Sequence, residues 1–258
     1  MTTAPIPATP ENIEKAAALI RSGGLVAFPT ETVYGLGCDA ANGNAVAAVF
    51  EAKARPQFKP LIIHVADASA AAEFVIFNET AATLTRAFWP GALTLILPRR
   101  AGCPVAELAA AGLETIAVRA PDHPLAQTLI RMAGRPIAAP SANRSGHISP
   151  TTARHVAANL GNACGMLLDG GRTPLGIEST VIDLCSKTPM LRRPGGITED
   201  EIAAHIGPLV KTAKGAKKHY TTGLPLRLDA KAAGPGEALL AFGPKAPKGA
   251  ANLSPAGD

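Results

Sequence analysis

The chain has 258 residues, of which 47% are hydrophobic and only 4% aromatic, and its formal net charge is +5 with a pI of about 9.2. The length suits one large domain, or one domain with a small appendage, around a mainly aliphatic core. No apolar run is long enough to span a membrane, and the N-terminus lacks the regions of a signal peptide, so we expect a cytoplasmic protein. The mild basic charge is compatible with phosphate-bearing ligands or RNA.

Short apolar strands alternate with helices along most of the chain. Thr9-Pro10 is typical of a helix start, Ser22-Gly23-Gly24 ends that helix, and residues 1–8 are expected to be a flexible lead-in. We expect strands near residues 25–28, 61–65, 92–97, 115–119, 136–140, 166–168, 178–184 and 189–192. Helices are expected near residues 10–21, 44–54, 68–75, 79–88, 105–110, 122–133, 151–160 and 198–206. This alternation indicates an α/β domain with a mixed, twisted β-sheet flanked by helices.

The stretch from Phe28 to Gly37 concentrates polar groups at the end of a strand. The apolar run Leu25–Phe28 reads as buried, and it stops at Pro29, which cannot donate within a central ladder. Thr30, Glu31, Thr32 and Tyr34 follow, and then Gly35 and Gly37 allow tight backbone geometry or close approach of a ligand. Open α/β sheets bind ligands just past their strand ends. A simple glycine turn after a strand fits this stretch equally well.

The composition changes after residue 207. Lysines among Gly, Ala and Thr indicate a basic linker over residues 208–225. Within residues 226–258, Leu226–Leu228 and Ala238–Phe242 are candidate strands, but so short a segment cannot bury a core of its own. We therefore expect a large domain over residues 1–207, a linker over residues 208–225, and a small appendage over residues 226–258.

Familiar catalytic motifs are absent, including a P-loop, a dinucleotide-binding glycine motif, a zinc-protease helix and a nucleophile elbow. The four cysteines show no metal-binding spacing and favour reduced side chains in a cytosolic protein. What remains is a set of basic and hydroxyl side chains near strand ends, and it is suited to holding anions. The set comprises Lys53, Arg55, Lys59, Arg119, Arg192 and Arg193, with Thr30, Thr32, Thr115, Ser141, Ser145, Ser149, Ser179 and Thr180.

Each member of this set also has a purely structural interpretation. A single Arg or Lys is more often a solvated surface charge, and Ser149 is a reasonable cap for the helix that starts near residue 151. His64, in an apolar strand, is more often a core residue than a ligand or base. Glu31 and Asp39 fit either metal binding or turn capping, and the sequence does not choose between these roles.

Five blocks of sequence, in order, give the chain a specific resemblance. It resembles the threonylcarbamoyl-AMP synthase family, which is built on the YrdC-type domain, over about residues 10–207. The blocks are Phe28-Pro-Thr-Glu-Thr-Val-Tyr-Gly-Leu-Gly37, Lys53-Ala-Arg-Pro through Pro60-Leu-Ile-Ile-His64, Trp89-Pro-Gly-Ala-Leu-Thr94, Ala139-Pro-Ser-Ala-Asn-Arg-Ser-Gly146, and Ile177-Glu-Ser-Thr-Val181 with Arg193-Pro-Gly195.

The resemblance implies a YrdC-like fold and a nucleotidyltransferase activity. L-threonine, bicarbonate and ATP, with Mg²⁺ assisting, would give threonylcarbamoyl-adenylate and pyrophosphate. A partner transferase would then move the threonylcarbamoyl group to the adenosine beside the anticodon of certain tRNAs. Such chemistry needs orientation and positive charge from the protein rather than a dedicated nucleophile.

The resemblance also assigns site residues by matching positions in the blocks. Lys53 and Arg55 are the implied catalytic residues, and the metal ligands are unassigned. The L-threonine pocket would use Thr32, His64, Arg119, Ala139 and Ser179, with Arg119 pairing with the threonine carboxylate. The ATP site would use Arg55, Lys59, Thr115, Ser141, Ser149, Arg193 and Tyr220.

Two features of the sequence bear on the match. Many relatives have Asn where Lys59 stands, and lysine still reaches a phosphate. The tail resembles the start of the longer, two-domain branch of the family, with His219-Tyr220 on the linker and Gly236–Pro244 opening a small Rossmann-like domain. The resemblance therefore implies that residues 226–258 are the truncated start of that second domain.

Two other classes of function are alternatives to this enzyme. A non-catalytic module that binds double-stranded RNA or tRNA is compatible with the basic pI, although no aromatic stacking platform or arginine-rich run is present. A carbamoyl-transfer module of hydrogenase-maturation proteins would carry zinc-finger-like and acylphosphatase regions, which this chain lacks. Threonine-dependent nucleotide binding favours the enzyme, whereas salt-sensitive RNA binding favours the RNA module.

Overall fold

The computed structural model describes residues 3–56, 59–211 and 224–256. The chain divides into two compact units, Met1–Tyr220 and Thr221–Asp258, which are described separately. His219 and Tyr220 lie outside the described residues. None of the helices in the described ranges is long and apolar enough to cross a membrane.

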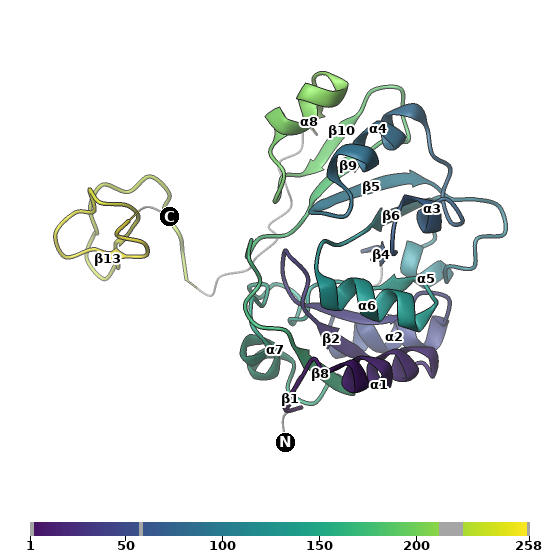
Figure 1. Ribbon diagram of the computed structural model, residues 1–258. Helices are drawn as coiled ribbons and strands as arrows, with labels where there is room; N and C mark the ends of the chain where they lie inside the picture. The colour runs from purple at the N-terminus through teal and green to yellow at the C-terminus, as the bar shows by residue number, and fades with distance from the viewer. Residues whose placement is uncertain (1–2, 57–58, 212–223, 257–258) are drawn as a thin grey trace. The chain divides into compact units, whose positions relative to one another are not determined.

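The first unit is built on one mixed sheet of 11 strands (Figure 1), in the order β1-β8-β2-β3-β7-β4-β6-β5-β9-β10-β11. The strands are β1 (Pro5–Pro7), β2 (Val26–Phe28), β3 (Gly35–Asp39), β4 (Ile62–His64), β5 (Leu93–Pro98), β6 (Thr115–Arg119), β7 (Ile137–Ala138), β8 (Met166–Asp169), β9 (Thr180–Asp183), β10 (Met190–Arg193) and β11 (Val210–Lys211). Parallel and antiparallel pairs are interspersed, so the predicted mixed α/β sheet is confirmed.

Helices cover both faces of this sheet. They are α1 (Pro10–Arg21), α2 (Gly43–Ala52), α3 (Ala68–Ala71), α4 (Glu79–Phe88), α5 (Glu107–Ala110), α6 (Pro124–Ala133), α7 (Ala153–Leu160) and α8 (Glu199–Ile206). The start of α1 follows the predicted rule, because the Thr9 side chain accepts a hydrogen bond from the Asn12 N–H and Pro10 occupies the first turn.

Two hydrophobic clusters lie on opposite faces of the sheet. The larger one joins alternate strand residues such as Ile63, Val118 and Leu95 to the apolar faces of α2, α4, α5, α7 and α8. The smaller one joins Val26, Phe28 and other residues of β2, β7 and β8 to α1 and α6, which lie side by side (Figure 1). Since α1 and α6 cover only one end of their face, alternate residues of β4, β6, β5 and β9 are left to line a site there.

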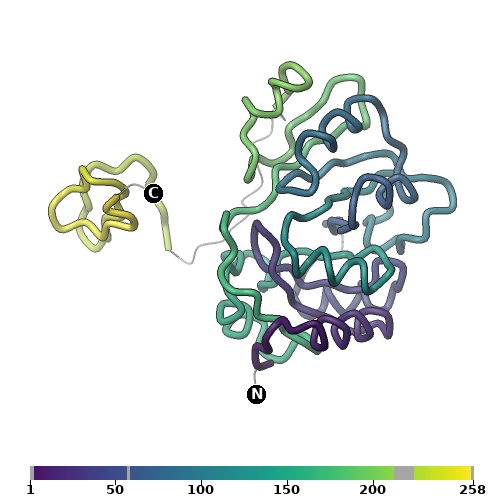
Figure 2. The backbone as a smooth tube through the Cα atoms, viewed as in Figure 1, coloured from purple at the N-terminus to yellow at the C-terminus, as the bar shows by residue number. Residues whose placement is uncertain are grey.

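One expectation and one of the two alternative readings for the N-terminal part are wrong. Residues 1–8 are not simply a flexible lead-in, because Pro5–Pro7 forms β1 and pairs in parallel with β8. Figure 2 shows this N-terminal segment, in purple, next to the green strand that it joins. Proline has no N–H to donate, but β1 is the outermost strand of the sheet, so its two prolines remove no hydrogen bond from a central strand.

The glycine-containing end of the opening stretch is also a strand rather than a turn. Gly35–Asp39 forms β3, which pairs antiparallel with both β2 and β7. A Cβ added to Gly37 would lie 2.6 Å from a Phe28 ring carbon and 2.8 Å from the Ile137 side chain. Gly37 is therefore required by close packing between neighbouring strands.

The second unit contains one small parallel pair, β12 (Leu240–Ala241) and β13 (Ala251–Asn252). The candidate strand at Ala238–Phe242 is thus confirmed at its centre. The one at Leu226–Leu228 is wrong, because these residues are irregular, and Leu226 and Leu228 are 68% and 76% exposed with no neighbouring strand. The proposed functional boundaries at residues 207 and 225 stay predictions.

Candidate functional site

A cavity of about 220 Å³ lies on the sheet face that carries α1 and α6, over strands that these helices leave uncovered. Its floor consists of alternate residues of adjacent strands, which point the same way because the side-chain period of a strand is two. Ile62 and His64 of β4 lie opposite Ala117 and Arg119 of β6, and Ile96 of β5 lies opposite Ala117. The intervening residues of the same strands belong to the larger hydrophobic cluster.

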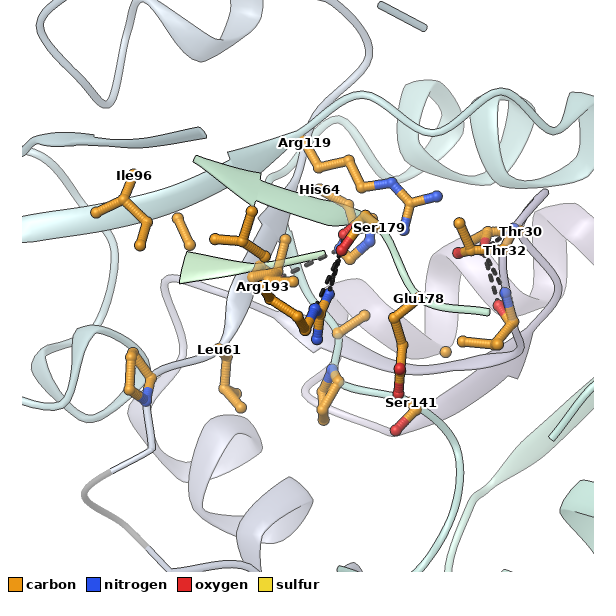
Figure 3. A pocket seen from close by; sticks show the side chains of 18 of the residues that line it. Thr30, Thr32, Leu61, His64, Ile96, Arg119, Ser141, Glu178, Ser179 and Arg193 are labelled. Atoms are coloured by element: carbon orange, nitrogen blue, oxygen red, sulfur yellow. Dashed lines mark hydrogen bonds between the residues drawn. The ribbon is translucent and has the colours of Figure 1, made fainter. Parts of the chain in front are cut away.

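The cavity gathers eight of the residues that the sequence predicted for a site. From the predicted threonine pocket these are Thr32, His64, Arg119, Ala139 and Ser179, and from the predicted ATP site they are Arg55, Ser141 and Arg193. Figure 3 shows most of their side chains around one hollow. Residues that are up to 161 positions apart in the chain therefore share one cavity, from Thr32 to Arg193.

Arg119 is held firmly at the end of β6. Its side chain is 5% exposed, and its Nη2 donates to Glu31 Oε1 at 2.6 Å while its Nε donates to Gly91 O at 3.2 Å. The sequence left Glu31 open between metal binding and turn capping, and in the structure Glu31 forms an ion pair with Arg119. Within the described residues Glu31 Oε2 is buried without a hydrogen-bond partner, so the pair is not fully satisfied. The planar guanidinium is thereby fixed in orientation at the cavity wall.

Ser179 and Arg193 form a second polar centre (Figure 3). Arg193 donates to the Ser179 carbonyl from Nε at 3.1 Å and from Nη2 at 2.9 Å, and Nη2 also donates to Ser179 Oγ at 3.1 Å. Behind Ser179, Thr94 Oγ1 lies 2.7 Å from Ser179 Oγ. Arg193 thus fixes the backbone and the hydroxyl of the residue beside it in the cavity.

Like charges are brought together near Arg55. Burial, followed by the positive charge of Arg193, lowers the pKa of Arg55 to about 10. Arg55 donates from Nη2 to Pro60 O at 3.1 Å. Two neighbouring guanidinium groups repel each other unless an anion lies between them, so the arrangement favours a phosphate-bearing ligand.

His64 is a neutral residue of the cavity floor. Burial, followed by the positive charge of Arg119, lowers the pKa of His64 to about 3. Its Nδ1 lies 3.2 Å from the Ile62 carbonyl, and hydrogen bonding to the Ile62 and Ile137 carbonyls acts against this lowering of the pKa. The histidine therefore combines the core position expected from its strand with a place in the cavity.

We expect His64 to make the protein less stable in mild acid. Below pH 6.5 the unfolded chain binds a proton on this imidazole that the folded chain excludes, so this contribution to stability falls as the pH falls toward 3. Between pH 7.5 and 5.0 the loss from this group should be about 2 kcal/mol. Urea unfolding of the wild type and of His64→Gln at both pH values checks this. An equal pH dependence in the two proteins would contradict it.

The threonines of the opening stretch line the cavity. Thr30 Oγ1 donates to the Val33 carbonyl at 2.7 Å and lies 2.8 Å from Thr32 Oγ1, and both residues are buried. The loop before Glu178 is joined to them, because Gly176 N–H donates to Thr32 O and Leu175 N–H donates to Glu31 O, both at 3.0 Å. These hydrogen bonds join two segments that are far apart in sequence and that both line the cavity.

Glu178 is a cavity residue that the sequence did not select. It is half-buried, lines the cavity, and accepts a hydrogen bond from Ser149 Oγ at 2.7 Å. Figure 3 shows its carboxylate directed toward Ser141. The only sequence signal was its place beside Ser179 in one of the five blocks. Ser149 therefore reaches the cavity through Glu178 rather than lining it.

Lys53 lies behind the cavity wall. It is 1% exposed, and its ammonium donates short hydrogen bonds to the carbonyls of Ser141 and Asn143. Burial, followed by the charge of Arg55, lowers the pKa of Lys53 to about 7, while Glu178 acts in the opposite direction. Its predicted catalytic role stays a prediction. In the structure its ammonium is hydrogen-bonded to the backbone that carries Ser141.

The other predicted ATP residues lie apart from the lining. Lys59 is exposed, and its carbonyl accepts a hydrogen bond from Arg55 Nε at 3.4 Å. Thr115 lies on the same face of β6 as Ala117 and Arg119, at the far end of the strand. Tyr220 is outside the described residues. The roles assigned to these residues stay predictions.

The carboxylates of the described residues form no metal cluster. No group of three or more His, Cys, Asp or Glu side chains suited to a metal ion occurs in the part of the chain that the structure describes. Asp39 caps a turn, because its Oδ1 accepts from the Ala41 N–H at 2.9 Å and its Oδ2 lies 3.6 Å from Arg135 Nε.

Comparison with known proteins shows the family to which this chain is similar. A family model named Sua5_yciO_yrdC, with the description "Telomere recombination", matches residues 18–195. A threonylcarbamoyl-AMP synthase of Bacillus subtilis is 54% identical over 198 residues, covering 76% of this chain and 57% of that protein. The synthase of Pyrococcus abyssi is 50% identical over 198 residues, covering 76% of this chain and 58% of that protein. The chain thus spans less than two thirds of the length of these curated relatives.

Solved structures share the fold. The structure of P. abyssi Sua5 complexed with L-threonine is 43% identical, with a TM-score of 0.77, and the match covers 90% of this chain and 68% of that one. The structure of E. coli YciO is 25% identical, with a TM-score of 0.67, and the match covers 75% of this chain and 92% of that one. The sheet and the helices around the cavity are therefore those of a known architecture.

Proposed function

The chain belongs to the Sua5/YciO/YrdC family, and we propose that it makes threonylcarbamoyl-AMP from L-threonine, bicarbonate and ATP, with release of pyrophosphate. The observation that carries this proposal is the single cavity that combines Arg119, His64 and Ser179 with Arg55 and Arg193. The carboxylate of an amino acid and the phosphates of a nucleotide are both anions, and both bind to hydrogen-bond donors of this kind. The names of the relatives favour this enzyme over the RNA-binding module.

The proposed chemistry requires no protein nucleophile. The threonine amine adds to bicarbonate with loss of water and gives a carbamate. A carbamate oxygen then attacks the α-phosphorus of ATP, and the bond to pyrophosphate breaks. The protein supplies fixed positive charge and orientation, which suits a site whose donors are already held by backbone carbonyls and by Glu31.

We carry over to this cavity the residue roles that the family resemblance implies. Arg119 would bind the threonine carboxylate, with Thr32, His64, the Ala139 backbone and Ser179 around the amino acid. Arg55, Ser141 and Arg193 would bind ATP, with Lys59, Thr115, Ser149 and Tyr220 as further proposed contacts. His64, neutral at physiological pH, places no second positive charge against the threonine amine.

Mg²⁺ would enter as the complex with ATP. Glu178 is the carboxylate on the lining, and Glu31 is engaged by Arg119, so the described residues offer no cage for a resident ion. Magnesium commonly binds through one or two carboxylates together with substrate phosphates. We also propose that the product passes to a transferase that modifies tRNA and that the reaction takes place in the cytoplasm.

Pyrophosphate release tests this function directly. Purified protein is supplied with ATP, Mg²⁺ and bicarbonate, with and without L-threonine, and the adenylate is identified by mass spectrometry. Threonine-dependent release of pyrophosphate is the expected result. Protein that binds neither ATP nor threonine, but binds RNA in a salt-sensitive manner, would overturn the proposal in favour of the RNA-binding module.

Arg55→Ala should weaken ATP binding by about tenfold, since it removes a charge-assisted contact to phosphate. Calorimetric titration with ATP in the absence of threonine measures this effect. Arg131→Ala, at an exposed position on α6, is the matched control and should bind ATP as the wild type does. Unchanged affinity of Arg55→Ala would refute the assignment.

A further inference from the structure

Thr94 lies directly behind the cavity, next to Ser179. It is on the same face of β5 as Ile96, which lines the cavity, but Thr94 itself is 0% exposed and is not part of the lining. Its hydroxyl oxygen lies 2.7 Å from Ser179 Oγ. Thr94 is therefore joined to the predicted threonine pocket by its hydrogen bond to Ser179.

The donors and acceptors around these two hydroxyls determine where their protons lie. A hydroxyl has one proton to donate and two lone pairs to accept, whereas a guanidinium can only donate. Arg193 Nη2 donates to Ser179 Oγ at 3.1 Å and so occupies one lone pair of the serine. The remaining lone pair and the proton of Ser179 are then left for Thr94 and for the cavity.

The fully buried Thr94 decides the direction of the shared hydrogen bond. Among the described residues, Ser179 Oγ is the only hydrogen-bond partner of the Thr94 hydroxyl. If Ser179 donated to Thr94, the Thr94 proton would be buried without an acceptor, which costs free energy. Thr94 must therefore donate, so Ser179 accepts from both Thr94 and Arg193.

We propose that Thr94 is a positioning residue that, together with Arg193, directs the hydroxyl proton of Ser179 into the cavity. With both lone pairs occupied, Ser179 faces the cavity as a hydrogen-bond donor only. It is then suited to an acceptor atom of the bound amino acid, such as a carboxylate or hydroxyl oxygen, and not to the ammonium group. This inference rests on the proposed function, because it takes the ligand beside Ser179 to be L-threonine.

Thr94→Val tests the proposal, because valine keeps the shape of threonine and removes its hydroxyl. The dissociation constant for L-threonine should rise about fivefold, the effect of one neutral hydrogen bond, while that for ATP stays unchanged. Thr94→Ser retains the donor and should restore the affinity. Thr85→Val is the matched control, because Thr85 is a buried threonine whose hydroxyl donates to Ala81 O within α4.

A double-mutant cycle separates positioning from a general loss of stability. In the Ser179→Ala background, Thr94→Val should change threonine affinity less than twofold, since the hydroxyl that Thr94 orients is gone. Independent effects of the two substitutions, an equal loss of ATP affinity, or failure of Thr94→Ser to restore binding would overturn the proposal. A wild-type chain that neither binds nor turns over threonine would overturn the proposed function as well, so the two failures are distinguishable.

Discussion

Arg119→Ala is expected to weaken L-threonine binding by about 10- to 100-fold and to leave ATP affinity close to that of the wild type. A charge-assisted pair with a carboxylate is worth about 1.5–3 kcal/mol, and Arg119 is held ready for it by Glu31 and by the Gly91 carbonyl. Calorimetric titrations with threonine and with ATP, each alone, measure the two affinities. Equal losses for both ligands would rule out a specific role in binding threonine.

The same substitution should also destabilise the protein, which calls for a second variant. Removing Arg119 leaves the buried Glu31 carboxylate without its partner, and breaking a buried ion pair costs about 3–5 kcal/mol. The double variant Glu31→Gln with Arg119→Met removes both charges and should recover much of this stability. Its threonine affinity should remain as low as that of Arg119→Ala. Recovery of binding in the double variant would show that Arg119 acts only by keeping the fold intact.

The Glu31–Arg119 pair illustrates what the sequence could predict about the site. Arg119 was selected because it ends an apolar strand and matches a family block, and it does line the cavity. Its partner lies 88 residues earlier in the chain, so no local pattern linked the two. Glu31 could therefore be read as a metal ligand or a cap until the fold brought β6 beside the Thr30–Thr32 segment.

The fold was predictable where apolar periodicity is strong. The expected strand over residues 115–119 and the expected helix over residues 10–21 match β6 and α1. The missed strand β3 reads Gly-Leu-Gly-Cys-Asp and has little intrinsic strand preference. It is a strand because β2 and β7 pair with it on both sides, and because only glycine fits at position 37 between Phe28 and Ile137.

Proximity in sequence to a motif proved a weak guide to the cavity. Lys53, Arg55 and Lys59 lie within seven positions, yet only Arg55 lines the cavity, while Lys59 is exposed and Lys53 is buried behind the wall. The end of α2 at Ala52 and the left-handed backbone at Ala54, with φ of +46°, turn these side chains in different directions. Such a divergence depends on backbone geometry that a list of basic residues does not contain.

Lys53→Met is expected to destabilise the first unit by about 3 kcal/mol and to abolish threonine-dependent pyrophosphate release. Methionine fills a similar volume but cannot donate to the carbonyls of Ser141 and Asn143, and each lost hydrogen bond to a charged group is worth about 1.5–3 kcal/mol. Differential scanning calorimetry should show a transition lower by roughly 6–12 °C. Lys15→Met is the matched control, since Lys15 is exposed and pairs with Glu11 one turn away.

The activity loss should follow from the backbone that Lys53 holds. The carbonyls of Ser141 and Asn143 belong to the segment after β7, and Ser141 forms part of the cavity wall opposite Gly35. Without the two hydrogen bonds from Lys53 this segment is held less firmly, and we expect the cavity wall to lose its shape. If Lys53 instead contacted phosphate directly, Lys53→Met would weaken ATP binding with little change in the unfolding temperature, and that result would contradict a structural role.

The pH dependence of stability gives an independent check on the same lysine. The folded pKa of Lys53, about 7, lies below that of the unfolded chain, so between pH 7 and about 10 the unfolded state binds the extra proton. The contribution of this group to stability should therefore rise with pH through that window, and Lys53→Met should lack the rise. The neutral amine still carries two N–H donors, so both carbonyls remain satisfied after deprotonation. Lys53 can thus lose its charge without releasing the wall of the cavity, which is the behaviour expected of a structural donor rather than of a phosphate-binding cation.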